Sequence, residues 1–285
     1  MSSIFWTRTS NIEPEIRGAA VKHYIIRGGV EGKKRLELLG RAMWPTTSRA
    51  LEWAGLSRGM TCLDLGCGGG DVTYELARLV GPEGRVIGVD YDEVKVDLAR
   101  KGASERGVRN AEFRTLDVLT WDEASRYDFI YCRFLLTHLK DPLDALRRIL
   151  RALRPGGVAL VEDIDFTGSV NHPPSAAMDT YVRLYRAAAA RRGCDADIGP
   201  KLYVMLRDAG FPSVEFEIVQ PAFASGECKQ LAAITLVNIA DTVLAEGLAS
   251  REDLDDAIEE FGRYTDDDRT IISAPRVFQV KGRRA

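Results

Sequence analysis

Residues 63–71 read Leu-Asp-Leu-Gly-Cys-Gly-Gly-Gly-Asp, an apolar, strand-like run that leads into a cluster of glycines. Glycines at such a turn let the backbone approach a ligand without a clash from a Cβ atom, and the following helix presents amide groups at its N-terminus. The next apolar run ends on Asp90, roughly 20 residues later, where a carboxylate can accept hydrogen bonds from both hydroxyls of a ribose. Together these features predict a nucleoside-binding site.

The spacing of the glycines bears on the kind of nucleoside. A dinucleotide fingerprint needs the pattern G-x-G-x-x-G. Counted from Gly66, the third glycine position holds Asp71, and counted from Gly68 it holds Thr73. Asp71 also places a negative charge where a pyrophosphate would lie. An adenosyl group joined to an amino acid therefore fits better, and an NAD-dependent dehydrogenase remains the least favoured alternative.

Short apolar runs alternate with amphipathic helical segments from Met60 onward, which indicates βαβ units and a parallel sheet covered on both faces. The predicted strands are residues 61–65, 85–89, 111–116, 128–132, 158–161, 214–219 and 276–281. The predicted helices are residues 71–80, 93–106, 142–153, 175–192, 199–210 and 227–264. Before these, Pro45 is predicted to end one helix and to begin a second one.

Composition restricts the function classes. The 285 residues carry a formal charge of −3, so the chain as a whole does not attract nucleic acid or anionic membranes. The five cysteines form no C-x-x-C pair, which leaves a zinc knuckle or a thioredoxin-type site unsupported, and we expect no metal. The N-terminus lacks the apolar core of a signal peptide, and the apolar stretch 231–240 is too short to span a bilayer. We expect a cytoplasmic protein.

Five motifs, in order, resemble those of the class I S-adenosylmethionine-dependent methyltransferases. They are LDLGCGGG (63–70), GVD (88–90), FRTLDV (113–118), YDFIYCRFLLTHLKD (127–141) and LRPGGVALVED (153–163). The chain is most similar to the small-molecule branch that includes quinone-biosynthesis enzymes. The resemblance implies a Rossmann-like α/β fold with a seven-stranded, mostly parallel sheet of order 3-2-1-4-5-7-6, an antiparallel last strand and a helical cap.

The resemblance covers residues 58–165, with weaker agreement to 220, and it suggests a division of the chain. The expected parts are an N-terminal helical lid (1–57), an S-adenosylmethionine-binding core (58–220), a helical cap insertion (221–270), and a final core strand with its tail (271–285). We expect the lid and the insertions to enclose a mainly apolar acceptor. Aromatic side chains that could line this enclosure are Trp44, Trp53, Phe166, Tyr181, Tyr185 and Phe223.

The resemblance also implies roles at the methionine and ribose end of the cofactor. The loop beneath it is shaped by Gly66, Gly68 and Gly70. Asp64 orients that loop or holds the cofactor's ammonium through water, although it could simply brace the turn. Asp90 binds the ribose hydroxyls.

Further roles follow by the same resemblance. Tyr91 flanks the adenine, Asp117 contacts the adenine amino group, and Val118 packs on the ring. Asp117 has a second reading, as the cap of a short segment near Trp121. Arg133 offers its backbone to the methionine moiety.

The N-terminal segment carries Tyr24, Arg27 and Arg35. Tyr24 could close over the cofactor carboxylate and Arg27 could pair with it. An amphipathic helix surface is the competing reading for all three.

A general base is not required, because positioning alone can supply much of the acceleration. Three residues are candidates for contact with the acceptor or its proton: His138 after the fourth strand, His172 in a later loop, and Asp163 in the acidic run 162–165 at the carboxyl end of the fifth strand. For each histidine, a structural role is the favoured reading.

The predicted function is methyl transfer from S-adenosyl-L-methionine to a small or medium-sized organic acceptor through oxygen, nitrogen or carbon. One alternative is a family member that retains the cofactor but catalyses a non-methyl reaction. Another is a non-catalytic binding module with this fold. The expected partner is a small-molecule acceptor, with no nucleic acid and no membrane, and a homodimer is left open.

Overall fold

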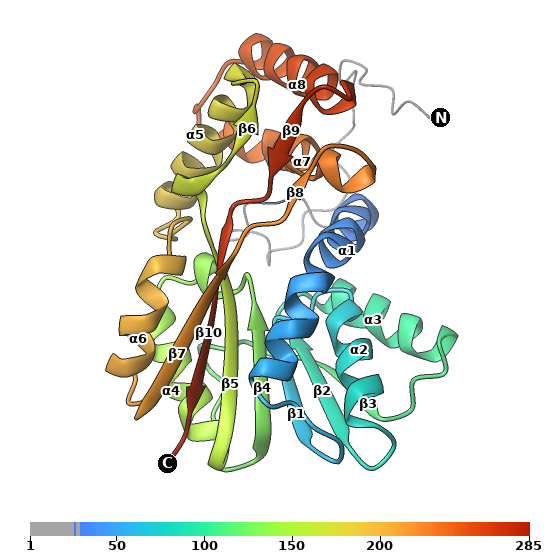
Figure 1. The fold of residues 1–285 in the computed structure, drawn as a ribbon, viewed down its shortest axis with the longest axis vertical. Helices are drawn as coiled ribbons and strands as arrows, with labels where there is room; N and C mark the ends of the chain where they lie inside the picture. The colour runs from blue at the N-terminus through green and yellow to red at the C-terminus, as the bar shows by residue number, and fades with distance from the viewer. Residues whose placement is uncertain (1–25, 27–28) are drawn as a thin grey trace.

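The computed structural model describes Ile26 and residues 29–285. Its main layer is a seven-stranded sheet of order β3-β2-β1-β4-β5-β10-β7 (Figure 1). These strands are β1 (Thr61–Leu65), β2 (Arg85–Asp90), β3 (Ala111–Thr115), β4 (Tyr127–Arg133), β5 (Leu153–Asp165), β7 (Ser213–Val219) and β10 (Arg276–Arg283). β1 to β5 are parallel, whereas β10 is antiparallel to both β5 and β7. Because β7 and β10 are the sixth and seventh core strands, the order is 3-2-1-4-5-7-6, which confirms the predicted Rossmann-like α/β fold.

Helices cover both faces of this sheet. On one face lie α1 (Gly29–Trp53), α2 (Asp71–Val80) and α3 (Glu93–Glu105), and on the other lie α4 (Pro142–Ala152) and α6 (Leu202–Asp208). Successive strand residues alternate between the two cores. Cys62 packs among α1 and α2 residues, whereas Leu63 belongs to the cluster that contains α4 and α6 residues. Burial on both faces explains why the strands read as continuous apolar runs.

The prediction that Pro45 separates two helices was wrong. α1 is one helix of 25 residues that contains Pro45. Proline lacks an N–H and therefore leaves one helical carbonyl without its usual bond. Met43 and Leu51, on either side of it, are 0% and 1% exposed, and they pack into different core clusters. The burial of both halves of the helix offsets the missing bond.

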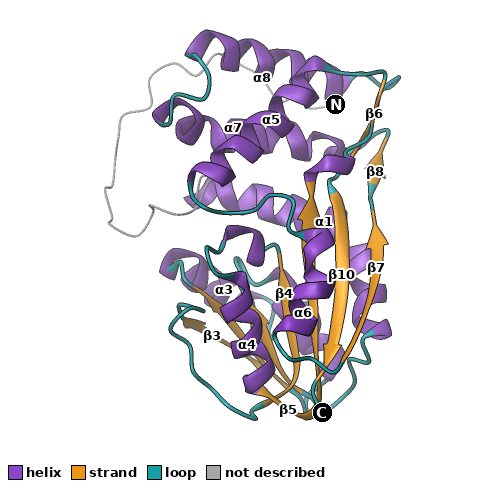
Figure 2. Ribbon diagram, turned by 90° about the vertical axis from the view of Figure 1, so that its left-hand side faces the viewer, coloured by secondary structure: helices purple, strands orange, loops and turns teal. Residues whose placement is uncertain are grey.

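A helical cap stands above the carboxyl ends of the parallel strands (Figures 1 and 2). It consists of α5 (Ala176–Arg191), α7 (Leu231–Ala245) and α8 (Arg251–Asp266), which pack on one another. A three-stranded sheet of order β6-β9-β8 joins it. Its strands are β6 (Asn171–His172), β8 (Ala222–Phe223) and β9 (Ile271–Ser273). The cap thus draws on segments far apart in sequence, and the sequence predicted none of these three short strands.

The apolar segment of the cap is longer than expected from residues 231–240. Together η4 (Glu227–Gln230) and α7 form a 19-residue helical stretch, Glu227–Ala245, with a mean hydropathy of 1.3. By length and composition alone this stretch could cross a membrane. Half of it is buried, however, and α7 contacts α1, α5 and α8. Buried helices at the centre of a folded domain have the same composition.

Candidate active site

The loop after β1 uses most of its amide groups on the protein itself. Gly66 and Cys67 both donate from their backbone nitrogens to the carbonyl of Val89, at 2.8 and 2.9 Å. Gly68 donates to Oδ2 of Asp90 at 2.9 Å. A pyrophosphate site needs free backbone amides in this loop. With these three amides engaged, the loop is unsuited to a dinucleotide, in agreement with the incomplete glycine fingerprint.

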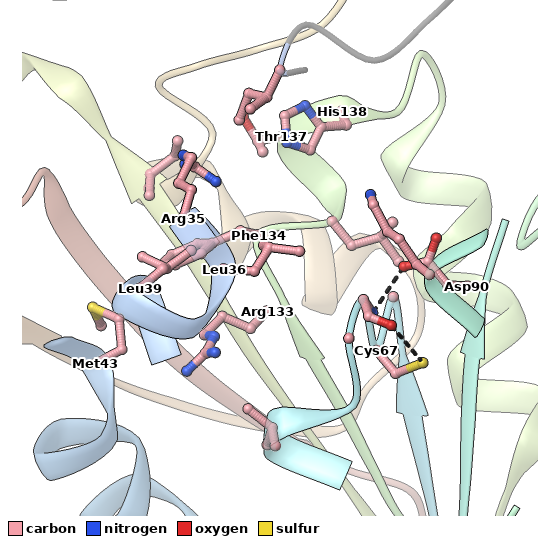
Figure 3. A pocket seen from close by; sticks show the side chains of 18 of the residues that line it. Arg35, Leu36, Leu39, Met43, Cys67, Asp90, Arg133, Phe134, Thr137 and His138 are labelled. Carbon is pink, nitrogen blue, oxygen red and sulfur yellow. Dashed lines mark hydrogen bonds between the residues drawn. The ribbon is translucent and has the colours of Figure 1, made fainter. Parts of the chain in front are cut away.

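Asp90 is fixed at the end of β2 by two backbone donors. Its Oδ2 accepts from Gly68 and its Oδ1 accepts from the nitrogen of Asp92 at 2.9 Å. The carboxylate is half-buried and lies on the wall of the cavity beside the loop (Figure 3). A carboxylate has about four acceptor positions, so each oxygen keeps capacity for one more donor. Asp90 is therefore ready to accept from the two adjacent hydroxyls of a ribose.

The glycines differ in what they do. Gly66 and Gly68 line the cavity with φ of +81° and +54°, and a Cβ at Gly66 would lie 3.3 Å from the Cβ of Leu135. Gly70 caps α2 with a φ of +87°, and a Cβ there would lie 2.8 Å from the ring of Tyr74. Gly70 thus permits helix packing, whereas Gly66 and Gly68 leave room for a ligand.

Asp64 is buried, and its Oδ2 accepts from the hydroxyl of Thr73 at 2.6 Å. Burial raises the pKa of Asp64 to about 6, although the Thr73 hydrogen bond and the positive charge of Arg133 oppose this rise. The contact with Thr73 joins β1 to α2, as expected for a brace. Asp64 also lies on the cavity wall, so its second predicted role remains geometrically open.

Tyr91, Asp117 and Val118 lie on the wall of the same cavity. Tyr91 is 58% exposed, so its ring is accessible from the cavity. Asp117 accepts a hydrogen bond at Oδ1 from the nitrogen of Leu119, and its carbonyl accepts from that of Trp121 at 3.0 Å. The capping contact predicted for Asp117 is therefore present, and it does not remove the side chain from the cavity.

Arg133 joins a buried polar network that the sequence did not reveal. Its guanidinium donates to Oγ1 of Thr47 at 3.3 Å, and Thr47 donates to Oε2 of Glu162 at 2.9 Å. The hydroxyl of Tyr131 and the amide of Gln279 also donate to Glu162, which is 0% exposed. The network links α1 to β4, β5 and β10. No local pattern signals it, because its members come from distant parts of the chain.

Of the three catalytic candidates, the structure brings only His138 to the cavity wall. Burial, aided by the positive charges of Lys95 and Arg35, lowers the pKa of His138 to about 3, so the imidazole is neutral near pH 7. Asp163 is fully buried, away from the described wall, and accepts from the backbone nitrogens of Thr137 and Ile164 at 3.0 and 2.9 Å. Asp163 therefore holds the short helix η1 (Leu136–His138) that carries His138.

His172 lies elsewhere. It is exposed in the small sheet of the cap, where β6 pairs with β9, and it is not on the described cavity wall. Tyr24 and Arg27 lie outside the described residues. Arg35 is 9% exposed and is on the cavity wall, a position that an amphipathic surface residue would not have.

One continuous cavity of about 1380 Å³ extends from the glycine loop to the cap. Single-ligand pockets are typically about 300–1,000 Å³, so this cavity has room for two ligands. Its cap end is mainly apolar and is lined by Leu39, Met43, Phe134, Phe166, Tyr181, Tyr185, Phe223 and Ile272. Four of the six predicted aromatics are in this set. The other two, Trp44 and Trp53, pack beside α2 and the sheet instead.

These features match an adenosyl ligand without phosphate, and the comparisons with known proteins agree. Residues 56–210 match the family model described as a methyltransferase domain. The ubiquinone/menaquinone biosynthesis C-methyltransferase UbiE of Escherichia coli is 32% identical over 186 residues, which cover 58% of this chain and 72% of that protein. The chain belongs to the class I S-adenosylmethionine-dependent methyltransferases. S-Adenosyl-L-methionine is therefore the cofactor of this methyltransferase.

Solved structures share the fold at low identity. The [4+2]-cyclase SpnF is 21% identical, with a TM-score of 0.52 over 84% of this chain and 80% of its own. YcgJ from Bacillus subtilis is 19% identical, with a TM-score of 0.54 over 82% and 95%. Phosphoethanolamine N-methyltransferase 2 of Haemonchus contortus, in complex with S-adenosyl-L-methionine, is 19% identical, with a TM-score of 0.52 over 93% and 55%. These likenesses concern the fold of the methyltransferase alone.

Proposed function

We propose that the methyltransferase transfers the methyl group of S-adenosyl-L-methionine to a small or medium-sized, largely apolar organic acceptor. The single observation that carries this proposal is the continuous cavity. Its polar end contains the glycine loop and Asp90, and its apolar end lies under the cap. A donor and an acceptor can therefore occupy one enclosure without an intervening wall, as direct transfer requires.

The bound cofactor supplies a methyl group already activated on a sulfonium. We assign the ribose hydroxyls to Asp90, because both of its oxygens are held in place by backbone donors. We place the adenine between Tyr91 and Val118, where Asp117 would accept a hydrogen bond from its amino group. The glycines of the loop, Gly66, Gly68 and Gly70, let its backbone adopt the shape that lets the cofactor lie close to it. Asp64 and Arg133 serve the methionine end, where Asp64 can reach the ammonium through water.

We propose that transfer depends mainly on alignment and on the exclusion of water. Among the predicted catalytic residues, only His138 reaches the cavity wall. A pKa of about 3 makes it a neutral hydrogen-bonding partner and a weak base. Asp163 acts as a positioning residue through Thr137. His172 is a candidate only for substrates that extend beyond the described wall.

The proposal covers carbon, nitrogen and oxygen as the accepting atom. UbiE is named a C-methyltransferase, which favours carbon by analogy. We further propose a cytoplasmic protein without nucleic-acid or membrane partners. The formal charge of −3 and the packing of α7 against α5 and α8 support these assignments. A homodimer is compatible with the proposal and is not needed to complete the site.

A second reading has a specific observation in its favour. The [4+2]-cyclase SpnF shares the fold, so a cofactor-retaining enzyme with non-methyl chemistry is a real competitor. A non-catalytic binding module is less favoured, because contact with a partner would not require the geometry of Asp90 and the loop.

The test combines calorimetry with isotope transfer. The purified protein is titrated with S-adenosylmethionine and with NAD, and is then incubated with methyl-labelled S-adenosylmethionine and a small-molecule extract of the host cells. We expect S-adenosylmethionine to bind and NAD not to bind. We also expect the labelled methyl group to appear in an organic product. Conversion of an extract component while the labelled cofactor is recovered intact would establish the non-methyl alternative. Failure of S-adenosylmethionine to bind would reject the proposed function altogether.

A further inference from the structure

Arg35 is a buried cation on the wall of the cavity. Its side chain is 9% exposed, and its Nε donates to Oγ1 of Thr235 at 2.9 Å. The hydroxyl of Thr235 in turn donates to the carbonyl of Leu231 at 2.7 Å, so its oxygen is oriented to accept from Arg35. Within the described part of the chain, no carboxylate forms an ion pair with this guanidinium. The N–H groups on the two terminal nitrogens of Arg35 are therefore not paired with a carboxylate of the described residues.

The position of Arg35 on α1 directs it to the cap and away from the glycine loop. Leu36 faces the loop, since a Cβ at Gly68 would lie 3.5 Å from Cδ1 of Leu36. Arg35, Leu39 and Met43 follow one another at intervals of four residues and so share a different helix face. Leu39 and Met43 pack in the apolar cluster of the cap. Figure 3 shows Arg35 above Leu39 on the α1 side of the pocket.

The groups on which the charge of Arg35 acts also place it at the cap end of the cavity. The positive charge of Arg35 lowers the pKa of Tyr181 in α5, which burial raises to about 12, and it also lowers the pKa of His138. At the loop end, a different cation, Arg133, acts on the pKa of Asp64. Arg35 therefore lies at the cap end of the cavity and Arg133 at the loop end, on a wall that also carries Lys95, Lys140 and Lys229.

Of Arg35 and Arg133, only Arg133 is balanced by carboxylates among the residues that the structure describes. The negative charges of Glu162 and Asp64 both raise the pKa of Arg133. Within residues 29–285, the side chain of Arg35 lies beside apolar and aromatic residues of the cavity wall and has one hydroxyl partner, Thr235. A buried charge without a counter-ion is costly, so buried charges in proteins are generally paired, and an anionic group of a ligand in the cavity would supply such a pair. The planar guanidinium is suited to two parallel hydrogen bonds with a carboxylate.

We propose that Arg35, held in place by Thr235, binds an anionic oxygen group on the acceptor, of which a carboxylate is the best geometric match. The acceptor is then an amphiphile: an apolar body lies against the aromatic side chains of the cap, and the anion pairs with Arg35. This inference rests on the proposed function, because it concerns the acceptor end of the same cavity. It makes Arg35 a specificity-determining residue.

The test uses two probes that share one hydrocarbon body, 4-phenylbutanoate and 4-phenylbutanamide. Each is titrated into protein saturated with S-adenosylhomocysteine. We expect the carboxylate to bind roughly 10- to 100-fold more tightly than the amide, the range for hydrogen bonds to a charged group. Arg35→Met should abolish this ratio. Arg49→Met, which changes an exposed arginine of the same helix, should preserve it.

Thr235→Val provides a milder variant in case Arg35→Met does not fold. It removes the hydroxyl that fixes the guanidinium but keeps the volume and the charge, so the ratio should fall several-fold. Equal affinity for the two probes, or failure of the carboxylate to bind, overturns the inference while S-adenosylhomocysteine still binds. Weaker binding of S-adenosylhomocysteine to Arg35→Met also overturns it, because Arg35 would then serve the cofactor. Absence of S-adenosylhomocysteine binding in the wild type would instead reject the proposed function.

Discussion

The carboxylate of Asp90 accepts a hydrogen bond from the backbone nitrogen of Gly68 at 2.9 Å, which ties the end of β2 to the loop that follows β1. This contact has two consequences. It takes one loop amide away from any phosphate, and it orients the carboxylate toward the cavity. A single residue therefore disfavours a dinucleotide and favours a ribose without phosphate.

Asp90→Asn should weaken cofactor binding. The asparagine retains one acceptor oxygen and presents an NH₂ group to one of the two backbone donors at Gly68 and Asp92. We expect the Kd for S-adenosylmethionine to rise roughly 10- to 100-fold, because the lost partners are hydrogen bonds to a charged group. Isothermal titration calorimetry measures this. Asp97→Asn, on the exposed side of α3, is the matched control, and equal Kd values for the two variants would contradict the assignment.

Gly66→Ala and Gly59→Ala separate backbone strain from crowding of the site. Both glycines have a φ of +81°, so alanine at either position should destabilise the fold by about 1 kcal/mol. At Gly66 the new Cβ would lie 3.3 Å from Leu135 on the cavity wall, whereas at Gly59 it meets nothing within 4 Å. Thermal unfolding should show similar losses in both variants. Calorimetry should show weakened S-adenosylmethionine binding only in Gly66→Ala; weakening in both would trace the effect to strain.

The sequence predicted the parts of the fold that local signals specify. α2 begins and ends at the predicted residues, 71 and 80, because Gly70 and Gly81 adopt positive φ at its two ends. The three short cap strands were missed because two or three residues are too few to show a periodicity. Pro45 misled the prediction because burial on both of its sides is a tertiary effect.

The two ends of the cavity also differ in how far local sequence signals specify them. The end of the cavity that we propose for the cofactor is lined by contiguous motifs, so the sequence alone could indicate that Asp64, Gly66, Gly68, Asp90 and Asp117 lie close together. The acceptor end depends on contacts such as Arg35 with Thr235, which are 200 residues apart. The network behind Arg133 likewise depends on Thr47 with Glu162, which are 115 residues apart. No rule based on residue spacing predicts such pairs. Asp163 was a reasonable catalytic candidate, but pleating directs it behind η1, where it holds Thr137.

Thr47→Val tests whether α1 is part of the core or a detachable lid. Valine keeps the volume but removes the donor to the buried Glu162, so we expect a loss of about 1–3 kcal/mol in unfolding free energy. Urea denaturation measures this. The control is Thr46→Val, whose hydroxyl donates to the carbonyl of Met43 in its own helix. Equal stability of the two variants would mean that α1 contributes to the site without supporting the fold.

Asp163 should make the free energy of unfolding decrease as the pH rises. Burial raises its pKa from 3.8 to about 7, so between these values the folded state binds a proton that the unfolded state has lost. This stabilising contribution is complete below pH 3.8 and is lost as the pH rises through about 7. Relative to Asp163→Asn, the wild type should therefore lose up to roughly 4 kcal/mol between pH 4 and pH 7.5 and then level off.

The comparison with Asp163→Asn isolates this effect, because His138 and Asp64 titrate in both proteins and their contributions cancel in the difference. Urea denaturation at pH 4.5, 6, 7 and 8 provides the curve. A difference that stays constant with pH would show that Asp163 is ionised throughout, and a difference that grows in favour of the wild type at high pH would reverse its role. In the first case the carboxylate would be held charged by the backbone nitrogens of Thr137 and Ile164.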